Sequence, residues 1–120
     1  MTNYKIGFVG AGKMARAIIK GLIKTGFAKP EELIATQAEK DTLEEKSKLL
    51  GIKVISDNKE LANSVNTVFI ATKPNQVEGV LAEISPYINS EKLVVSIAAG
   101  VTTTKLEAGL PEGTRVIRVM

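Results

Sequence analysis

The chain has 120 residues, 44% of them hydrophobic and 24% charged, which predicts one soluble domain with one core. The absence of Cys and His excludes a disulfide framework, a thiol nucleophile and the usual zinc sites, so we expect no bound metal. The net charge of +3 is spread along the chain and no apolar run approaches roughly 18 residues, which argues against nucleic-acid binding and against a membrane span.

The first half of the chain alternates short apolar runs with longer helical patterns. A strand is predicted at Tyr4–Val9. A helix follows from about Gly12 to Thr25, because apolar residues recur there at helical spacing. The next predicted elements are a strand at Leu33–Thr36, a charged helix at Glu39–Leu50 and a strand at Lys53–Ile55.

The second half continues this alternation. Three helices are predicted from capping pairs, in which a polar residue precedes Glu by three positions: Asp57 with Glu60, Asn75 with Glu78, and Thr104 with Glu107. The predicted strands are Thr67–Ala71, Lys92–Ile97 and Arg115–Val119. Such alternation predicts an α/β fold with a mostly parallel sheet and helices on both faces.

The most informative segment is Gly10-Ala11-Gly12-Lys13-Met14-Ala15, which joins the first strand to the first helix. Gly10 permits the tight turn, Gly12 lets a pyrophosphate approach the backbone, and Ala15 lets the helix pack close to the strand. Free amides at the helix start favour a negative ligand, and Lys13 adds a positive charge. A strand before the loop and a helix after it are the context of a dinucleotide-binding fingerprint, and they predict a Rossmann-like, doubly wound fold.

The end of the second predicted strand bears on the choice of cofactor. NAD-specific proteins usually carry Asp or Glu there to bind the ribose 2′-hydroxyl, whereas this chain has Thr36-Gln37-Ala38 and no acid before Glu39. A hydroxyl and an amide can donate to a 2′-phosphate, and Asn58 and Lys40 are further candidates in this region. The sequence therefore favours NADP, or tolerance of both NADP and NAD.

Two more strand ends should line the same crevice, since ligands bind beyond the carboxyl ends of parallel strands. One is Ala71-Thr72-Lys73-Pro74 and the other is Ile97-Ala98-Ala99-Gly100. Small residues there leave room for a flat ring and a ribose. Lys73 is either a cofactor-side residue or a plain surface lysine.

Taken together, these segments resemble pyrroline-5-carboxylate reductases over the whole chain. The glycine loop is shared with many dehydrogenases, while the later stretches are more specific. The matching stretches are Ile6–Ala15, Ala71–Pro74, Val94–Val101 and Arg115–Met120.

The resemblance implies reduction of the imine bond of 1-pyrroline-5-carboxylate to give L-proline, with hydride from NADPH or NADH. By similarity, Val9 to Met14 hold the pyrophosphate, Thr36 and Asn58 face the adenosine ribose, and Ala71 to Pro74 with Ala98 and Ala99 flank the nicotinamide. Residues 1–120 would form the NAD(P)-binding domain. In the family a helical second domain follows, which forms the dimer, builds larger homo-oligomers and supplies most of the pocket for the small-molecule substrate.

Three other functions stay open from the sequence. The first is a dehydrogenase of the same fold with another substrate, such as a 3-hydroxyacid. The second is a non-catalytic paralogue that binds a nucleotide, against which the intact glycine loop argues. The third is a methyltransferase, for which an acid at the end of the second strand would be expected.

The two ends of the sequence carry two further expectations. The start has no secretion signal, so we expect a cytoplasmic protein. The chain stops at Met120 on its last predicted strand, so we expect it to be a piece of a longer protein. Catalytic residues are not identifiable in it, and we expect the isolated piece to bind cofactor weakly and to have little or no turnover.

Overall fold

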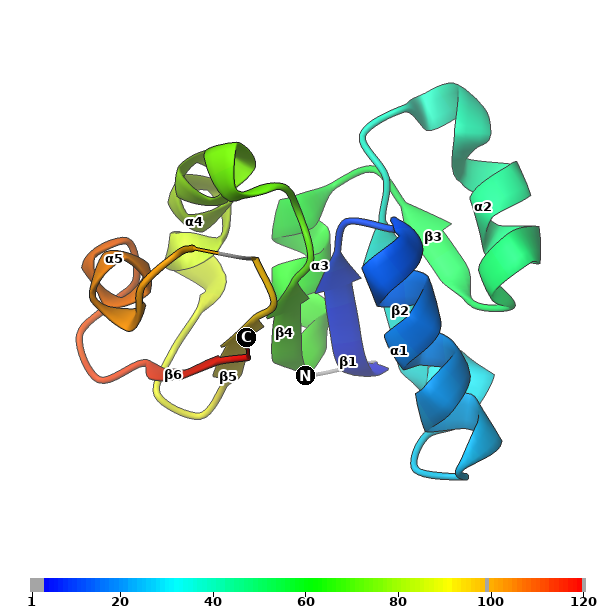
Figure 1. Ribbon diagram of the computed structural model, residues 1–120, viewed down its shortest axis with the longest axis horizontal. Helices are drawn as coiled ribbons and strands as arrows, with labels where there is room; N and C mark the ends of the chain where they lie inside the picture. The colour runs from blue at the N-terminus through cyan, green and yellow to red at the C-terminus, as the bar shows by residue number, and fades with distance from the viewer. Residues whose placement is uncertain (1–3, 99, 120) are drawn as a thin grey trace.

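A parallel sheet organises the computed structural model, which describes residues 4–98 and 100–119. Within these residues six strands pair side by side, all parallel, in the order β3-β2-β1-β4-β5-β6 (Figure 1). The strands are β1 (Tyr4–Val9), β2 (Leu33–Thr36), β3 (Lys53–Ile55), β4 (Val65–Ile70), β5 (Leu93–Ser96) and β6 (Arg115–Arg118). This is the strand order of a doubly wound nucleotide-binding sheet, so the predicted Rossmann-like fold is confirmed.

The helices connect successive strands. They are α1 (Lys13–Lys24), α2 (Leu43–Leu50), α3 (Asn58–Ser64), α4 (Val77–Ile84) and α5 (Thr103–Ala108), with short 3-10 turns at Pro30–Glu32, Lys40–Thr42, Pro74–Gln76 and Ser85–Tyr87. Crossovers between parallel strands are right-handed, and the strand order reverses its direction after β3. The helices α1 and α2 therefore cover one face of the sheet, and α3, α4 and α5 cover the other (Figure 1).

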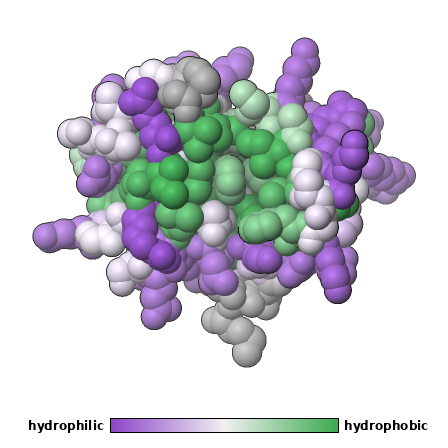
Figure 2. Space-filling view, turned by 60° about the horizontal axis from the view of Figure 1, so that its bottom comes forward, coloured by the Kyte–Doolittle hydropathy of each residue, from purple (hydrophilic) through white to green (hydrophobic). Residues whose placement is uncertain are grey.

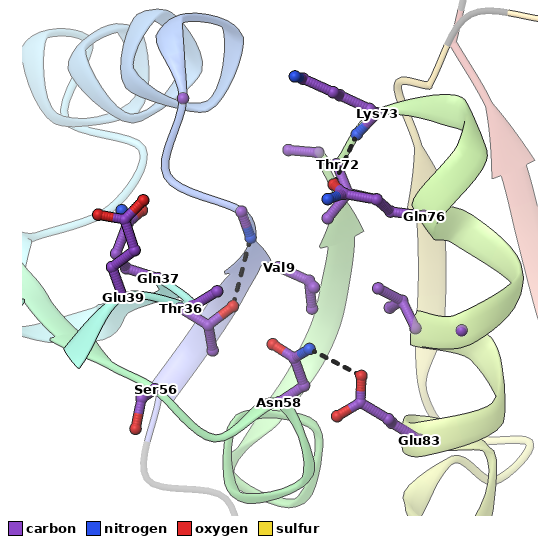
Figure 3. Close-up of a pocket in the computed structure, with 16 residues that line it drawn as sticks. Val9, Thr36, Gln37, Glu39, Ser56, Asn58, Thr72, Lys73, Gln76 and Glu83 are labelled. Carbon is purple, nitrogen blue, oxygen red and sulfur yellow. Dashed lines mark hydrogen bonds between the residues drawn. The ribbon is translucent and has the colours of Figure 1, made fainter.

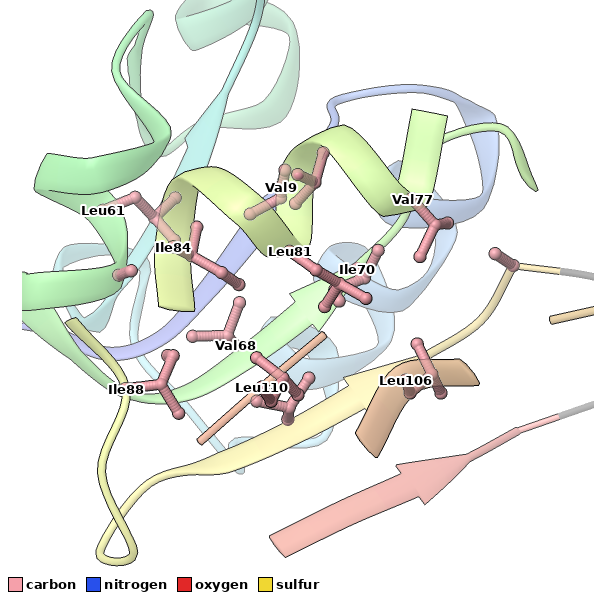
Figure 4. Packing of buried hydrophobic residues seen from close by; sticks show 14 of the residues in the cluster. Val9, Leu61, Val68, Ile70, Val77, Leu81, Ile84, Ile88, Leu106 and Leu110 are labelled. Atoms are coloured by element: carbon pink, nitrogen blue, oxygen red, sulfur yellow. The ribbon is translucent and has the colours of Figure 1, made fainter. Parts of the chain in front are cut away.

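Two apolar clusters fix these layers. On the side of α3, α4 and α5, Val68 of β4 belongs to a cluster that includes leucines from the helices, such as Leu61 and Leu106 (Figure 4). On the side of α1 and α2, Phe8 lies with Ile19, and its ring stacks on Phe69 at 4.9 Å between centroids. Alternate strand residues thus point into opposite clusters, as the period of a strand requires.

The helix α3 packs closely against β1 at Gly7. A Cβ at this position would lie 2.6 Å from Cδ2 of Leu61 and 3.0 Å from Cγ1 of Val65. Only a residue without a side chain lets α3 pack against β1 at this depth. This contact holds the start of α3, and with it Asn58, close to the end of β1.

One half of the sheet has no crossover helix on the side of α1. The two helices on that side follow β1 and β2, so the described part of the chain places no helix over β5 and β6 there. Ile117 and Val119, in and just after β6, are each 48% exposed, and apolar side chains gather on the face seen in Figure 2. Among the helices of residues 4–98 and 100–119, none has the length and apolar character needed to cross a membrane.

A buried lysine lies at the edge of the sheet where the strands begin. Lys92, 7% exposed, precedes β5 and donates from Nζ to the carbonyl oxygen of Ala62 in α3 at 2.5 Å. Burial away from water lowers the pKa of the Lys92 ammonium below its ordinary value.

The helix caps confirm one of the three predicted pairs in part and contradict two. Asp57 caps α3 by accepting from the amides of Lys59 and Glu60. The pair of Asn75 and Glu78 is wrong, because α4 continues from the 3-10 turn and begins only at Val77, with no side-chain cap at its N-cap residue, Gln76. The pair of Thr104 and Glu107 is also wrong, because the cap of α5 is Thr102, whose hydroxyl accepts from the amide of Lys105 at 3.2 Å.

Candidate functional site

A cleft of about 660 Å³ opens beyond the carboxyl ends of β1, β2 and β4, where the strand order reverses (Figure 3). This is the position at which open parallel sheets bind ligands. Nine of the residues predicted for the site line it: Val9, Gly10, Gly12, Thr36, Gln37, Asn58, Ala71, Thr72 and Lys73. The topology therefore brings together segments that are far apart in the sequence.

The turn out of β1 needs glycine at position 10 for two independent reasons. Gly10 has a φ of +105°, which side chains rarely adopt, and a Cβ there would lie 2.9 Å from the carbonyl oxygen of Ala71. The turn is held on both sides. The Gly10 amide donates to the hydroxyl of Thr36 at 3.3 Å, and the Ala71 amide donates to the carbonyl of Val9 at 2.9 Å.

Gly12, in contrast, is not required by the fold. Its backbone is extended, with φ −83° and ψ −167°, and a Cβ built on it would meet nothing within 4 Å. It is the N-cap of α1, where the first amides of a helix lack intrahelical partners, and no acidic residue lies in the first turn. A missing side chain in front of a helix N-terminus suits the close approach of an anion such as a pyrophosphate.

The side chains at the end of β2 are engaged within the protein. Thr36 is 3% exposed, and its oxygen already accepts from Gly10. Gln37 donates from Nε2 to the hydroxyl of Thr42 at 3.3 Å, and its backbone amide donates to the carbonyl of Ile55 at 2.9 Å. Both residues line the cleft, but their hydrogen bonds also hold the loops around it.

Asn58 and Glu83 form the wall between α3 and α4. The Asn58 amide donates from Nδ2 to Oε1 of Glu83 at 3.3 Å (Figure 3). Glu39, after β2, also lines the cleft, so two carboxylates lie along its walls.

The loop after β4 combines a lysine with an unsatisfied hydroxyl. The Lys73 amide donates to the side chain of Gln76 at 3.4 Å, which shapes the 3-10 turn (Figure 3). The Thr72 hydroxyl oxygen is buried and has no hydrogen-bond partner among the described residues. A buried hydroxyl without a partner is costly, so a ligand that bonded to it would remove that cost.

Five of the predicted residues are not among those that line the cleft. Ala11 and Ala98 are buried, whereas Lys13, Met14 and Pro74 are exposed. Ala99 lies outside the described residues. Contact of these residues with a nucleotide stays a prediction.

Several lining residues were not predicted from the sequence. Four of them follow the helical spacing of i, i+3, i+4 and i+7 along one side of α4 and the turn before it: Gln76, Gly79, Val80 and Glu83. Projecting the helix after the Lys73-Pro74 turn would have indicated this face. Ala38, Glu39 and Ser56 complete the lining.

Comparison with known proteins agrees with this geometry. A family model described as NADP oxidoreductase coenzyme F420-dependent matches residues 5–100. The chain belongs to this family.

Individual relatives and structures add detail. The pyrroline-5-carboxylate reductase of Methanosarcina acetivorans is 44% identical over 120 residues, which is 100% of this chain and 44% of the relative. The Coxiella burnetii pyrroline-5-carboxylate reductase structure has a TM-score of 0.88 at 33% identity, covering 99% of this chain and 44% of that one.

A third comparison concerns a structure with cofactor. The Plasmodium falciparum pyrroline carboxylate reductase, solved with NADP bound, has a TM-score of 0.83 at 32% identity and covers 100% of this chain and 43% of its own. The predicted resemblance to pyrroline-5-carboxylate reductases is confirmed. The chain spans less than half the length of the curated relatives it matches.

Proposed function

We propose that this chain is the cofactor-binding part of a pyrroline-5-carboxylate reductase. The observation that carries the proposal is the Gly12 backbone, which faces the cleft without a side chain although the fold does not require glycine there. The resemblance of the relatives supports the substrate, 1-pyrroline-5-carboxylate, and the product, L-proline. In this reaction a hydride adds to the imine carbon and a proton to the nitrogen.

Bound NADPH or NADH would supply the hydride, and the chain's own residues would bind and orient it. The amides from Val9 to Met14 would hold the pyrophosphate. The residues Thr36, Gln37 and Asn58 would surround the adenosine ribose, and Ala71 to Pro74 with Ala98 and Ala99 would flank the nicotinamide. The Thr72 hydroxyl, buried without a partner, is suited to bond with a polar group there.

The preference for NADPH rests on the end of β2, where Thr36, Gln37 and Ala38 carry no negative charge. The remaining substrate contacts, the assembly into homo-oligomers of dimers and the cytoplasmic location are proposals from the resemblance.

An activity assay on the complete gene product that contains residues 1–120 tests the proposal. The absorbance of the reduced nicotinamide should fall only when 1-pyrroline-5-carboxylate is present. With NADPH or with NADH, the amount of proline formed should equal the amount of cofactor oxidised. Binding of the cofactors without reduction of this substrate would reject the reductase and leave another dehydrogenase or a non-catalytic nucleotide-binding protein. No binding of either cofactor would reject the dinucleotide site itself.

A further inference from the structure

The contact between Asn58 and Glu83 fixes which end of the Asn58 amide faces the cleft. A carboxylate only accepts hydrogen bonds, so the Nδ2 group of Asn58 must be the end that meets Glu83, as it does at 3.3 Å. The amide oxygen is left on the other side, turned toward the part of the cleft where Thr36 lies (Figure 3). Asn58 thus presents an acceptor, not a donor, toward the end of β2.

An acceptor at this place distinguishes the two nicotinamide cofactors. The ribose 2′ position of a bound dinucleotide lies beside the end of β2. A free 2′-hydroxyl can donate to the Asn58 oxygen, whereas a 2′-phosphate carries about −1.5 to −2 charges at neutral pH and offers mainly acceptors. The Glu83 carboxylate, which lines the same cleft, also repels a 2′-phosphate, a group that NADP carries and NAD lacks.

We propose that Glu83 is a positioning residue that holds Asn58 as an acceptor and so lowers the affinity for NADP relative to NAD. The inference rests on the proposed dinucleotide site and adds a residue that sets its selectivity. Thr36, Gln37 and Ala38 favour the 2′-phosphate by their lack of charge. Glu83, which lines the cleft from α4, opposes this preference for NADP.

The test compares Glu83→Gln with the unchanged protein, using the complete gene product and calorimetric titration with NADP⁺ and with NAD⁺. A glutamine removes the charge and can accept or donate, so Asn58 becomes free to turn its Nδ2 toward the ribose. The dissociation constant for NADP⁺ should fall by about 3- to 10-fold, which is the size of one charge interaction screened by water. The dissociation constant for NAD⁺ should change by less than about twofold. Glu83 is exposed, so the variant should fold, and circular dichroism verifies this.

Glu78→Gln is the matched control, because Glu78 lies in the same helix, is exposed and does not line the cleft. It removes the same charge and should leave the NADP⁺ to NAD⁺ ratio unchanged. Glu83→Gln combined with Asn58→Ala separates positioning from simple repulsion. If Glu83 acts through Asn58, at least half of its effect on the ratio disappears in the Asn58→Ala background.

The outcomes divide cleanly between the two proposals. Binding of both nucleotides by the unchanged protein with a ratio that Glu83→Gln does not move overturns the role of Glu83 alone. An effect that persists in full with Asn58→Ala also overturns it, since Glu83 would then act only by its charge. Failure of the unchanged protein to bind either nucleotide overturns the proposed function and this inference together.

Discussion

Replacing Gly12 with Val tests whether the space in front of α1 is needed for folding or for binding a ligand. The extended backbone of Gly12 suits a β-branched residue, and a Cβ there meets nothing within 4 Å. The loss of a glycine N-cap should cost about 1 kcal/mol or less. Chemical denaturation should therefore show a nearly unchanged free energy of unfolding.

The affinity for a dinucleotide should respond much more strongly. A side chain at position 12 would hold a pyrophosphate away from the amides of the first turn of α1. Losing one hydrogen bond to a charged group costs about 1.5–3 kcal/mol, which corresponds to an increase of about 10- to 100-fold in the dissociation constant for NADPH. Titration of the complete gene product with NADPH, followed by fluorescence or calorimetry, measures this increase.

Two other glycines provide the controls for this experiment. Gly21→Ala, inside α1 with open space around its Cβ, should raise stability by about 0.5–1 kcal/mol and leave the affinity alone. Gly10→Ala should lower stability, because its φ is +105° and its Cβ would meet Ala71. An unchanged NADPH affinity in Gly12→Val, with the protein folded, would refute the assignment of this loop to the pyrophosphate.

Three further predictions follow from other contacts. Gly7→Ala should destabilise the protein by about 1–3 kcal/mol in urea denaturation, because the new methyl group meets Leu61 at 2.6 Å; a loss below about 0.5 kcal/mol would mean that α3 can move away from β1. Thr36→Asp should raise the ratio of the NADPH to the NADH dissociation constant about 10-fold or more, and equal changes for both cofactors would show that the 2′-phosphate does not lie there. Because burial lowers the pKa of Lys92 in the folded state, the unfolded chain binds more protons between that lowered pKa and the ordinary value of 10.5, so stability from this group rises with pH across that window. Lys92→Met should remove this rise, and parallel stability profiles for the two proteins would contradict it.

Most of the fold could be predicted because its signals are local. The apolar run of β1, the glycine turn and the helical spacing of α1 follow one another within about one βαβ unit, and they predict a parallel sheet with helices on both faces. The order of the strands was not predicted, because right-handed crossovers fix the face that each helix covers and leave the reversal after β3 open. The cap of α5 was misplaced for a local reason too. Three threonines occur in succession from Thr102 to Thr104, and only the path of the chain out of β5 decides which one meets the amide of Lys105.

The missed part of the site depends on contacts between distant segments. Glu83 meets Asn58 across 25 positions of sequence, and nothing around either residue indicates the other. The glycine loop could be predicted because the role of each of its residues follows from one short segment of sequence. The lining residues of α4 were missed because they face the cleft only once β1 and β4 lie side by side in the sheet.

The hydrogen bond from the Gly10 amide to Thr36 bears on attempts to redesign the cofactor preference of this domain. Thr36 supplies an acceptor to the peptide turn, so we expect Ser, Asn and Asp, which also carry an acceptor on a short side chain, to replace it best. Most members of a library that randomises this codon freely would lose the hydrogen bond to the Gly10 amide. Selection for a new cofactor should instead accumulate changes at Gln37, Ala38 and the facing helix.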